Sequence, residues 1–155
     1  DNNFLEDIKN ITYDKCISLM MSIEKETNIK FPGAMQKPNS FWDFIVDNKL
    51  KDISSKHCIT AHASGSFSDF LWEFNDEECK KIMIDELAKL VNFEKIQTKI
   101  YKWKYAKPKQ VLNYFFKKDK HNQNLIVTGE VFGGAKLEGA FLSGFNTANH
   151  LLNNR

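Results

Sequence analysis

Cysteine, long apolar runs and proline are all scarce in this sequence of 155 residues. Its three cysteines, Cys16, Cys58 and Cys79, lie too far apart for a C-x-x-C zinc or redox pair, and their odd number argues against a disulfide framework. No apolar run approaches the roughly 20 residues of a membrane span, and the first ten residues lack the pattern of a signal peptide. We therefore expect free thiols, no membrane partner and a cytoplasmic location.

An excess of charge of one sign is also missing. The 22 basic and 20 acidic residues leave a net charge of +2, so the overall balance gives no reason to expect nucleic acid as a partner. The four histidines have no metal-ligand spacing, and none is recognisably paired with a serine or cysteine. We expect no metal site, and we expect His62 to be a core histidine whose hydrogen bonds are satisfied.

The residues that are present favour a folded α+β domain, because 42% of them are hydrophobic and 13% aromatic. Alternation predicts strands near residues 16–23, 40–48 and 56–64. A short helix is expected over 69–74, capped by Ser66 or Ser68. The clearest helix covers 75–91, with Asn75 as its N-cap and one apolar face formed by Cys79, Ile82, Met83, Leu87, Leu90 and Val91.

The second half of the sequence predicts an alternating strand of about ten residues that ends at Pro108, a short strand over 124–129 and a helix over 137–152. The buried side of that helix is expected to carry Leu137, Ala140, Phe141, Ala148 and Leu151. The pattern predicts an antiparallel or mixed sheet with helices packed on it, followed by a terminal unit of strand, Gly-rich turn and helix.

Five of the seven glycines lie within sixteen positions: Gly129, Gly133, Gly134, Gly139 and Gly144. Glycine costs roughly 1 kcal/mol in a helix interior relative to alanine, so Gly139 and Gly144 indicate that something approaches the backbone closely. That neighbour is either another part of the chain or an anion held by the free N–H groups of a helix start. The spacing matches neither a P-loop nor a G-x-G-x-x-G fingerprint.

Three blocks of the sequence, taken in order, resemble the flavin-containing amine oxidases and especially their renalase-like branch. CITAHASGSFSDFLWE (residues 58–73) is similar to the segment before the long helix of that branch. YKWKYAKP (101–108) resembles its H-R-W-R-Y-A-x-P stretch, and TGEVFGGAKLEGAFLSGFNTANHL (128–151) resembles the C-terminal signature of the family. With the intervening spacing, the resemblance covers most of the chain from about Tyr13 onward.

The resemblance implies a two-domain enzyme that binds FAD, with a nucleotide-binding fingerprint upstream of this segment. Residues 1–108 would be a substrate-domain segment, and residues 109–155 would be the closing segment of the FAD-binding domain. The sequence begins with Asp1 rather than Met, which also fits a portion of a longer protein. We expect the chain alone to be inactive and to self-associate through the face that the missing domain would cover.

By the same resemblance, Glu130 would lie near the flavin ribityl chain, although renalase-like members more often have Asp there. The turn from Gly133 to Gly139 would face the isoalloxazine ring. The N–H groups at the start of the last helix would stabilise the negative charge that a flavin gains on accepting a hydride, and the Glu138 side chain would point away and cap the helix. The implied cofactor-binding residues are Gly129, Glu130, Gly133, Gly134, Leu137, Glu138 and Gly139.

Tyr101, Trp103 and Tyr105 alternate with lysines on the strand before Pro108. They either pack in the core or form a wall of the substrate pocket. A nucleic-acid patch is a third interpretation, but strict alternation puts the lysines and the aromatic rings on opposite faces of the strand, which argues against it.

The leading hypothesis is a C-terminal portion of an FAD-dependent oxidoreductase of the amine-oxidase type. A hydride would pass from an amine or a reduced nicotinamide-like substrate to flavin N5, and no catalytic side chain is identified because the sequence offers no convincing general base. The alternative is a non-enzymatic interaction module of the same fold that has lost the cofactor and binds a partner through exposed aromatic residues.

Overall fold

The computed structural model describes residues 2–37, 39–122 and 124–153. The chain divides into two compact units, which we describe separately: a sheet unit of residues 15–104, and a terminal unit of residues 1–14 and 105–155. The predicted domain boundary lies between residues 108 and 109, whereas the terminal unit resumes at Tyr105 and also includes the first 14 residues.

The sheet unit is organised around a five-stranded sheet in the order β2-β3-β4-β1-β5. Its strands are β1 (Tyr13–Ile23), β2 (Ala34–Met35), β3 (Trp42–Asp47), β4 (Cys58–Ala63) and β5 (Lys95–Pro108). β1 pairs with β4, β4 with β3 and β3 with β2, each antiparallel. The register places Ser18 opposite His62 and Met20 opposite Thr60. The predicted strands at 16–23, 40–48 and 56–64 are confirmed as β1, β3 and β4, and the α+β class is confirmed.

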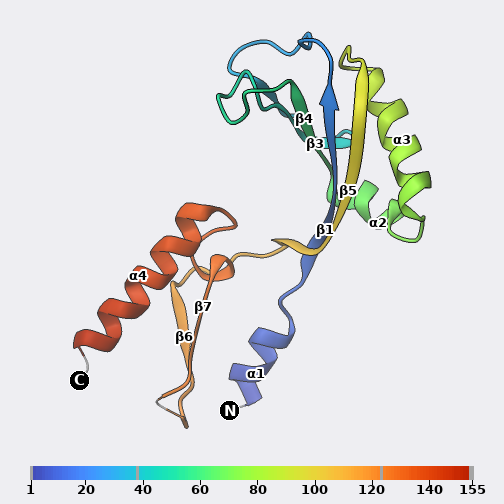
Figure 1. Ribbon diagram of the computed structural model, residues 1–155. Helices are drawn as coiled ribbons and strands as arrows, with labels where there is room; N and C mark the ends of the chain where they lie inside the picture. The colour runs from blue at the N-terminus through green and yellow to red at the C-terminus, as the bar shows by residue number, and fades with distance from the viewer. Residues whose placement is uncertain (1, 38, 123, 154–155) are drawn as a thin grey trace. The chain divides into compact units, whose positions relative to one another are not determined.

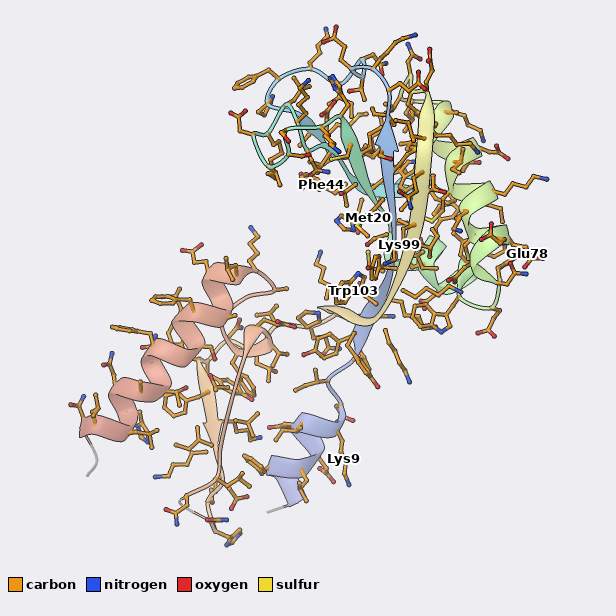
Figure 2. All side chains as sticks on the ribbon, in the orientation of Figure 1. Lys9, Met20, Phe44, Glu78, Lys99 and Trp103 are labelled. Atoms are coloured by element: carbon orange, nitrogen blue, oxygen red, sulfur yellow. The ribbon has the colours of Figure 1, made fainter. Side chains whose placement is uncertain are left out.

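Two helices of the sheet unit, α2 (Gly65–Leu71) and α3 (Asp76–Ala88), cover the same face of the sheet (Figure 1). Alternate residues of the strands enter the core on that side, where they meet the predicted apolar face of α3. In Figure 2, Met20 and Phe44 lie on one side of the sheet and Glu78, on α3, lies on the other. We call the side away from α2 and α3 the open face. The buried core includes Ile17, Leu19, Met21, Ile59, Ala61, Cys79, Met83 and Leu87.

The two helices of the sheet unit differ in how their first turns are capped. The Glu78 N–H donates to Asn75 Oδ1 at 3.0 Å and the Asn75 N–H donates to Glu78 Oε2 at 3.2 Å, so the predicted N-cap is confirmed as a full capping box. The prediction that Ser66 or Ser68 caps the preceding helix is wrong, because α2 already begins after Ser64. Ser68 lies inside α2, where its buried hydroxyl accepts from the Ile17 N–H at 3.0 Å and donates to the Ala63 carbonyl.

β5 is longer than predicted, with 14 residues, and its aromatic side faces outward. Tyr101, Trp103 and Tyr105 are 40%, 56% and 69% exposed, so the interpretation that they pack in the core is wrong. The side of the strand that carries Ile100 and Lys102 packs toward the helices: Ile100 is in the core, and the Lys102 ammonium donates to the carbonyls of Phe74 at 2.6 Å and Trp72 at 3.4 Å. Alternation therefore places the aromatic rings on the opposite side.

The terminal unit contains α1 (Asn2–Lys9), a two-stranded antiparallel sheet of β6 (Phe116–Lys118) and β7 (Ile126–Thr128), the short 3-10 helix η1 (Glu130–Phe132) and α4 (Leu137–Asn153). β7 and α4 confirm the predicted strand and helix, whereas α1 and β6 were not predicted. Residues of α4 contact β6, β7 and η1 (Figure 1). A two-stranded sheet is at best marginally stable alone, so its packing against α4 holds this unit together.

The predicted buried side of α4 is wrong for four of its five residues, and the fifth, Ala140, is half-buried. Leu137, Phe141 and Leu151 are 90%, 67% and 50% exposed, and Ala148 is exposed as well. The side that packs is small and polar and repeats every four residues, as Gly139, Ser143 and Thr147. The Ser143 hydroxyl donates to the Phe115 carbonyl at 2.5 Å and accepts from the Gly129 N–H at 2.9 Å, which fixes α4 against the strand ends.

Small residues are required on that side because α4 starts in contact with the backbone of the Gly-rich turn. A Cβ atom on Gly139 would lie 2.2 Å from the Gly134 carbonyl oxygen, and one on Gly133 would lie 2.2 Å from the Gly139 oxygen. Both atoms belong to the main chain, so no side-chain rotation relieves the overlap. Gly144, on the same helix, has nothing within 4 Å of a Cβ position.

We predict opposite effects for two matched substitutions in α4. Gly139→Ala should lower the free energy of unfolding by about 1–3 kcal/mol, because the turn and the helix must separate. Gly144→Ala should raise it by about 0.5–1 kcal/mol, since alanine favours the helix and meets no atom there. Urea unfolding followed by circular dichroism measures both, and equal effects of the two substitutions would contradict the close contact.

Candidate functional site

The Gly-rich turn between β7 and α4 is the segment to which sequence analysis assigned the cofactor. Gly129 and Gly134 adopt φ values of 150° and 128°, in the region that favours glycine, and η1 occupies the residues between Gly129 and Gly133. The Gly134 N–H donates to the Glu130 carbonyl at 3.0 Å, and the Lys136 N–H donates to the Gly134 carbonyl at 2.7 Å. Backbone hydrogen bonds within the turn therefore fix its conformation.

A cleft of about 390 Å³ lies beside this turn, within the terminal unit. A Cβ atom on Gly129 would meet nothing within 4 Å, so the backbone is open there. Glu130 is half-buried on the cleft wall. Burial, and to a smaller extent the charge of Glu130, raise the pKa of Tyr13 above its ordinary value. The cleft thus combines the Glu130 carboxylate, the Tyr13 phenol and an accessible backbone at Gly129. Its wall consists of Ile8, Ile11, Tyr13, Val127, Thr128, Gly129, Glu130, Val131 and Phe132.

The first turn of α4 is exposed at Leu137 and Glu138 and buried at Gly139, which packs on the turn. The N–H groups of a first helical turn have no acceptor within the helix. Together with the helix dipole, these groups favour a negative charge or a carbonyl oxygen. Glu138 lies in that first turn, as expected of an acid that complements the dipole.

The structure brings the predicted cofactor residues together in two groups. Gly133 and Gly139 lie where a Cβ atom would overlap main-chain atoms, so their missing side chains serve the packing of the chain itself, whereas Gly134 is favoured by its φ of 128°. Gly129 and Glu130 line the cleft, where the backbone has room for a ligand to approach. The second group fits the demands of a polar cofactor chain better than the first, because Gly129 leaves open space beside the cleft.

A second polar cluster lies on the open face of the sheet unit and was missed by sequence analysis. Ser18 Oγ lies 2.7 Å from His62 Nδ1, and Cys16 Sγ lies 3.6 Å from the same nitrogen. The expectation that no serine or cysteine pairs with a histidine is therefore wrong for His62. Ser18 and Cys16 are 44 and 46 residues away from His62 in the sequence, and the pairing of β1 with β4, which sets Ser18 opposite His62, brings them together.

Burial controls the protonation of this cluster. It lowers the pKa of His62 below its ordinary value, although the charge of Asp43 acts in the opposite direction. Burial also raises the pKa of the Cys16 thiol, a shift that the hydrogen bond to Ser18 partly offsets. His62 is therefore a neutral imidazole at pH 7, and Cys16 is a protonated thiol rather than a reactive thiolate.

A larger cleft, of about 470 Å³, also lies in the sheet unit. Met20 and Thr60, which face each other across β1 and β4, contribute to its wall next to the rung of Ser18 and His62. Lys99 of β5 reaches it too, with its ammonium 4.7 Å from the centre of the Tyr101 ring. The predicted pocket residues Tyr101, Trp103 and Tyr105 are exposed but do not line this cleft.

In residues 2–37, 39–122 and 124–153, no group of three or more His, Cys, Asp or Glu side chains is arranged to hold a metal ion. Within the same residues, none of the helices combines the length and the apolar character that crossing a bilayer requires.

We predict that His62 makes the stability of the protein depend on pH. Because its pKa is lower in the folded state, the unfolded chain binds a proton first as the pH falls below about 6.5, so stability is lost in that range. His62→Gln should reduce this loss. Urea unfolding at about pH 7.5 and pH 5 measures the difference, and identical pH dependence in wild type and His62→Gln would show the prediction to be wrong.

Comparison with known proteins identifies no family for this chain. None of the protein-family models matches the chain, and none of the curated proteins matches it either. The resemblance to flavin-containing amine oxidases is thus carried by residues 58–73, 101–108 and 128–151 alone.

Proposed function

We propose that this chain is the C-terminal portion of an FAD-dependent oxidoreductase of the amine-oxidase type. The observation that carries the proposal is the segment from Gly129 to Gly139, in which an open backbone, a half-buried acid and an accessible helix start follow one another. Glu130 would hold a hydroxyl of the cofactor chain, and the N–H groups of Leu137 and Glu138 would face the ring system. The bound flavin would supply the chemistry, as the acceptor of a hydride from the substrate.

The exposed side of α4 supports the view that a further part of the protein completes the terminal unit. Large apolar side chains on this helix face outward, and they form a surface of the kind that other protein parts usually cover. The aromatic rings of Phe141 and Phe145 stack with their centroids 6.1 Å apart on that side. The exposed members of this apolar side are Leu137, Phe141, Phe145, Leu151 and Leu152.

The open face of the sheet unit supports a role in binding substrate. Trp103 and Tyr101 are exposed, and a cleft opens beside Met20 and Lys99. Binding sites combine apolar walls with a few polar groups, and here the polar groups include Lys99 and the Thr60 hydroxyl. The substrate would be an amine or a reduced nicotinamide-like molecule.

A non-enzymatic interaction module is the second candidate, and the exposure of Trp103 and Tyr105 favours it, since such rings are enriched in protein interfaces. The two candidates differ in one respect. The oxidoreductase requires a nucleotide-binding segment upstream of residue 1, and the module does not.

We predict that residues 1–155 alone retain no FAD after desalting, whereas a longer product that includes the upstream segment retains one flavin per chain. In the longer product, Gly129→Val should weaken retention about tenfold or more, because a branched side chain would fill the open space and strain a backbone with φ of 150°. Gly144→Ala is the matched control and should have no effect.

Tight binding of FAD by residues 1–155 would show that no upstream segment is needed. A longer product without flavin would overturn the oxidoreductase proposal and leave the interaction module.

We also predict that the isolated chain self-associates through the exposed side of α4. Replacing Phe141 and Phe145 by serine should shift the chain toward the monomer, because the stacked rings contribute much of that apolar surface. Replacing Asn149, an exposed polar residue of the same helix, by serine should have no effect. Sedimentation velocity measures the association, and a strictly monomeric wild-type chain would contradict the prediction.

A further inference from the structure

Asn48 lines the cleft of about 470 Å³ in the sheet unit, and the orientation of its side-chain amide can be assigned. The amide nitrogen lies 3.0 Å from Thr60 Oγ1 and 3.4 Å from the Cys58 carbonyl oxygen. A carbonyl oxygen can only accept a hydrogen bond, so the Asn48 atom that faces it is Nδ2 and not Oδ1. Both protons of the Asn48 amide are therefore donated within the protein.

The backbone of Asn48 is bonded as well, so Oδ1 is the polar atom that remains. The Asn48 N–H donates to the Cys58 carbonyl at 2.9 Å, and the Asn48 carbonyl accepts from the N–H groups of Ile53 and Ser54. In the part of the chain that the structure describes, Oδ1 makes no hydrogen bond, yet it is not among the buried polar atoms that lack a partner. Asn48 Oδ1 is therefore an accessible acceptor on a firmly held residue.

The Thr60 hydroxyl is the matching donor. Its oxygen accepts from Asn48 Nδ2, and among the hydrogen bonds of the described residues none is donated by this hydroxyl. Its proton is thus available to an acceptor in the cleft, which Thr60 also lines. The donor and the acceptor are neighbours, because Nδ2, which contacts Thr60, is bonded to the same carbon atom as Oδ1.

Apolar side chains surround this pair. Met20 lies opposite Thr60 across β1 and β4, and Ile53, in the loop after β3, is 67% exposed although it is apolar. Lys99 brings an ammonium to the wall, and none of the described residues that line the cleft has a carboxylate. The wall therefore offers an apolar surface and one donor–acceptor pair, and it has no negative side chain to hold a cation.

We propose that Asn48 and Thr60 bind an uncharged nitrogen-containing group of a ligand. Asn48 Oδ1 accepts from its N–H, and the Thr60 hydroxyl donates to its lone pair or carbonyl oxygen. A primary carboxamide and an uncharged amine both fit, whereas an ammonium ion has no lone pair to accept from Thr60. The apolar body of the ligand lies against Met20 and Ile53. This proposal rests on the open face being the substrate side of the proposed oxidoreductase, and it assigns the uncharged form of an amine to that side.

The ligand class is tested on residues 1–155 without flavin, with three aromatic probes that are uncharged at about pH 7. Benzamide has N–H groups and a carbonyl, aniline has N–H groups and a lone pair, and acetophenone has the carbonyl but no N–H. Benzamide or aniline should cause saturable NMR shifts of the Met20 methyl group and the Asn48 side-chain amide, and the tighter of the two identifies the group as amide or amine. Acetophenone should bind about fivefold more weakly than benzamide, the effect of one lost hydrogen bond.

Variants of Thr60 test the donor. Thr60→Val replaces the hydroxyl by a methyl group of similar size and should weaken benzamide binding about fivefold. Thr60→Ser keeps the hydroxyl and should bind like the wild type, which a purely structural role of Thr60 would not predict. Thr98→Val is the matched control and should also bind like the wild type, because alternation places Thr98 on the same side of β5 as Ile100, which packs in the core.

Three outcomes would overturn the proposal: no saturable binding of benzamide or aniline, acetophenone binding as tightly as benzamide, or Thr60→Val binding benzamide like the wild type. If Thr60→Val does not fold, the comparison of benzamide with acetophenone on the wild-type chain still decides. Failure here is distinct from failure of the flavin proposal, because retention of FAD by the longer product depends on Gly129 and Glu130 and should be unaffected by Thr60→Val.

Discussion

The backbone contact between Gly139 and the turn at Gly133 and Gly134 is the constraint on which the terminal unit depends. Because main-chain atoms meet there, α4 must present small residues to the strands, and its large side chains must face the other way. The polar side of α4 compensates through Ser143, whose hydroxyl joins the helix to both Gly129 and Phe115. The close approach of Gly139 to the turn thus determines both which side of α4 packs on the strands and which apolar side is left exposed.

In the sheet unit, by contrast, apolar side-chain packing rather than backbone contact holds the helices against the strands. α2 and α3 bury one face of the sheet, and the capping box at Asn75 and the lysine bonds of Lys102 fix the start of α3 and the orientation of β5. The other face also carries polar groups, of which Ser18 is buried and His62 is half-buried. Ser18 and His62 satisfy each other there, which allows a neutral imidazole to persist in a partly dry environment.

Sequence patterns predicted the elements well where the signal was local, as at α3 with its capping box and apolar face, and at β1, β3 and β4 with their alternation. They failed where the outcome depended on a distant neighbour. Periodicity shows that Phe141 and Leu151 share a side of α4, but it cannot show that Gly139 takes the contact with the turn. Nor can it show that Lys102 finds carbonyl acceptors, or that His62 lies opposite Ser18.

The exposed side of α4 and the open face of the sheet are different kinds of surface, and that difference bears on function. The α4 side is formed by exposed large apolar side chains, which suits permanent cover by another part of a protein. The open face has a cleft whose wall combines methionine and isoleucine side chains with the Thr60 hydroxyl and the Lys99 ammonium, which suits a small molecule that binds reversibly. An enzyme assembled from separated segments needs both kinds of surface in one chain, whereas an interaction module needs only the first.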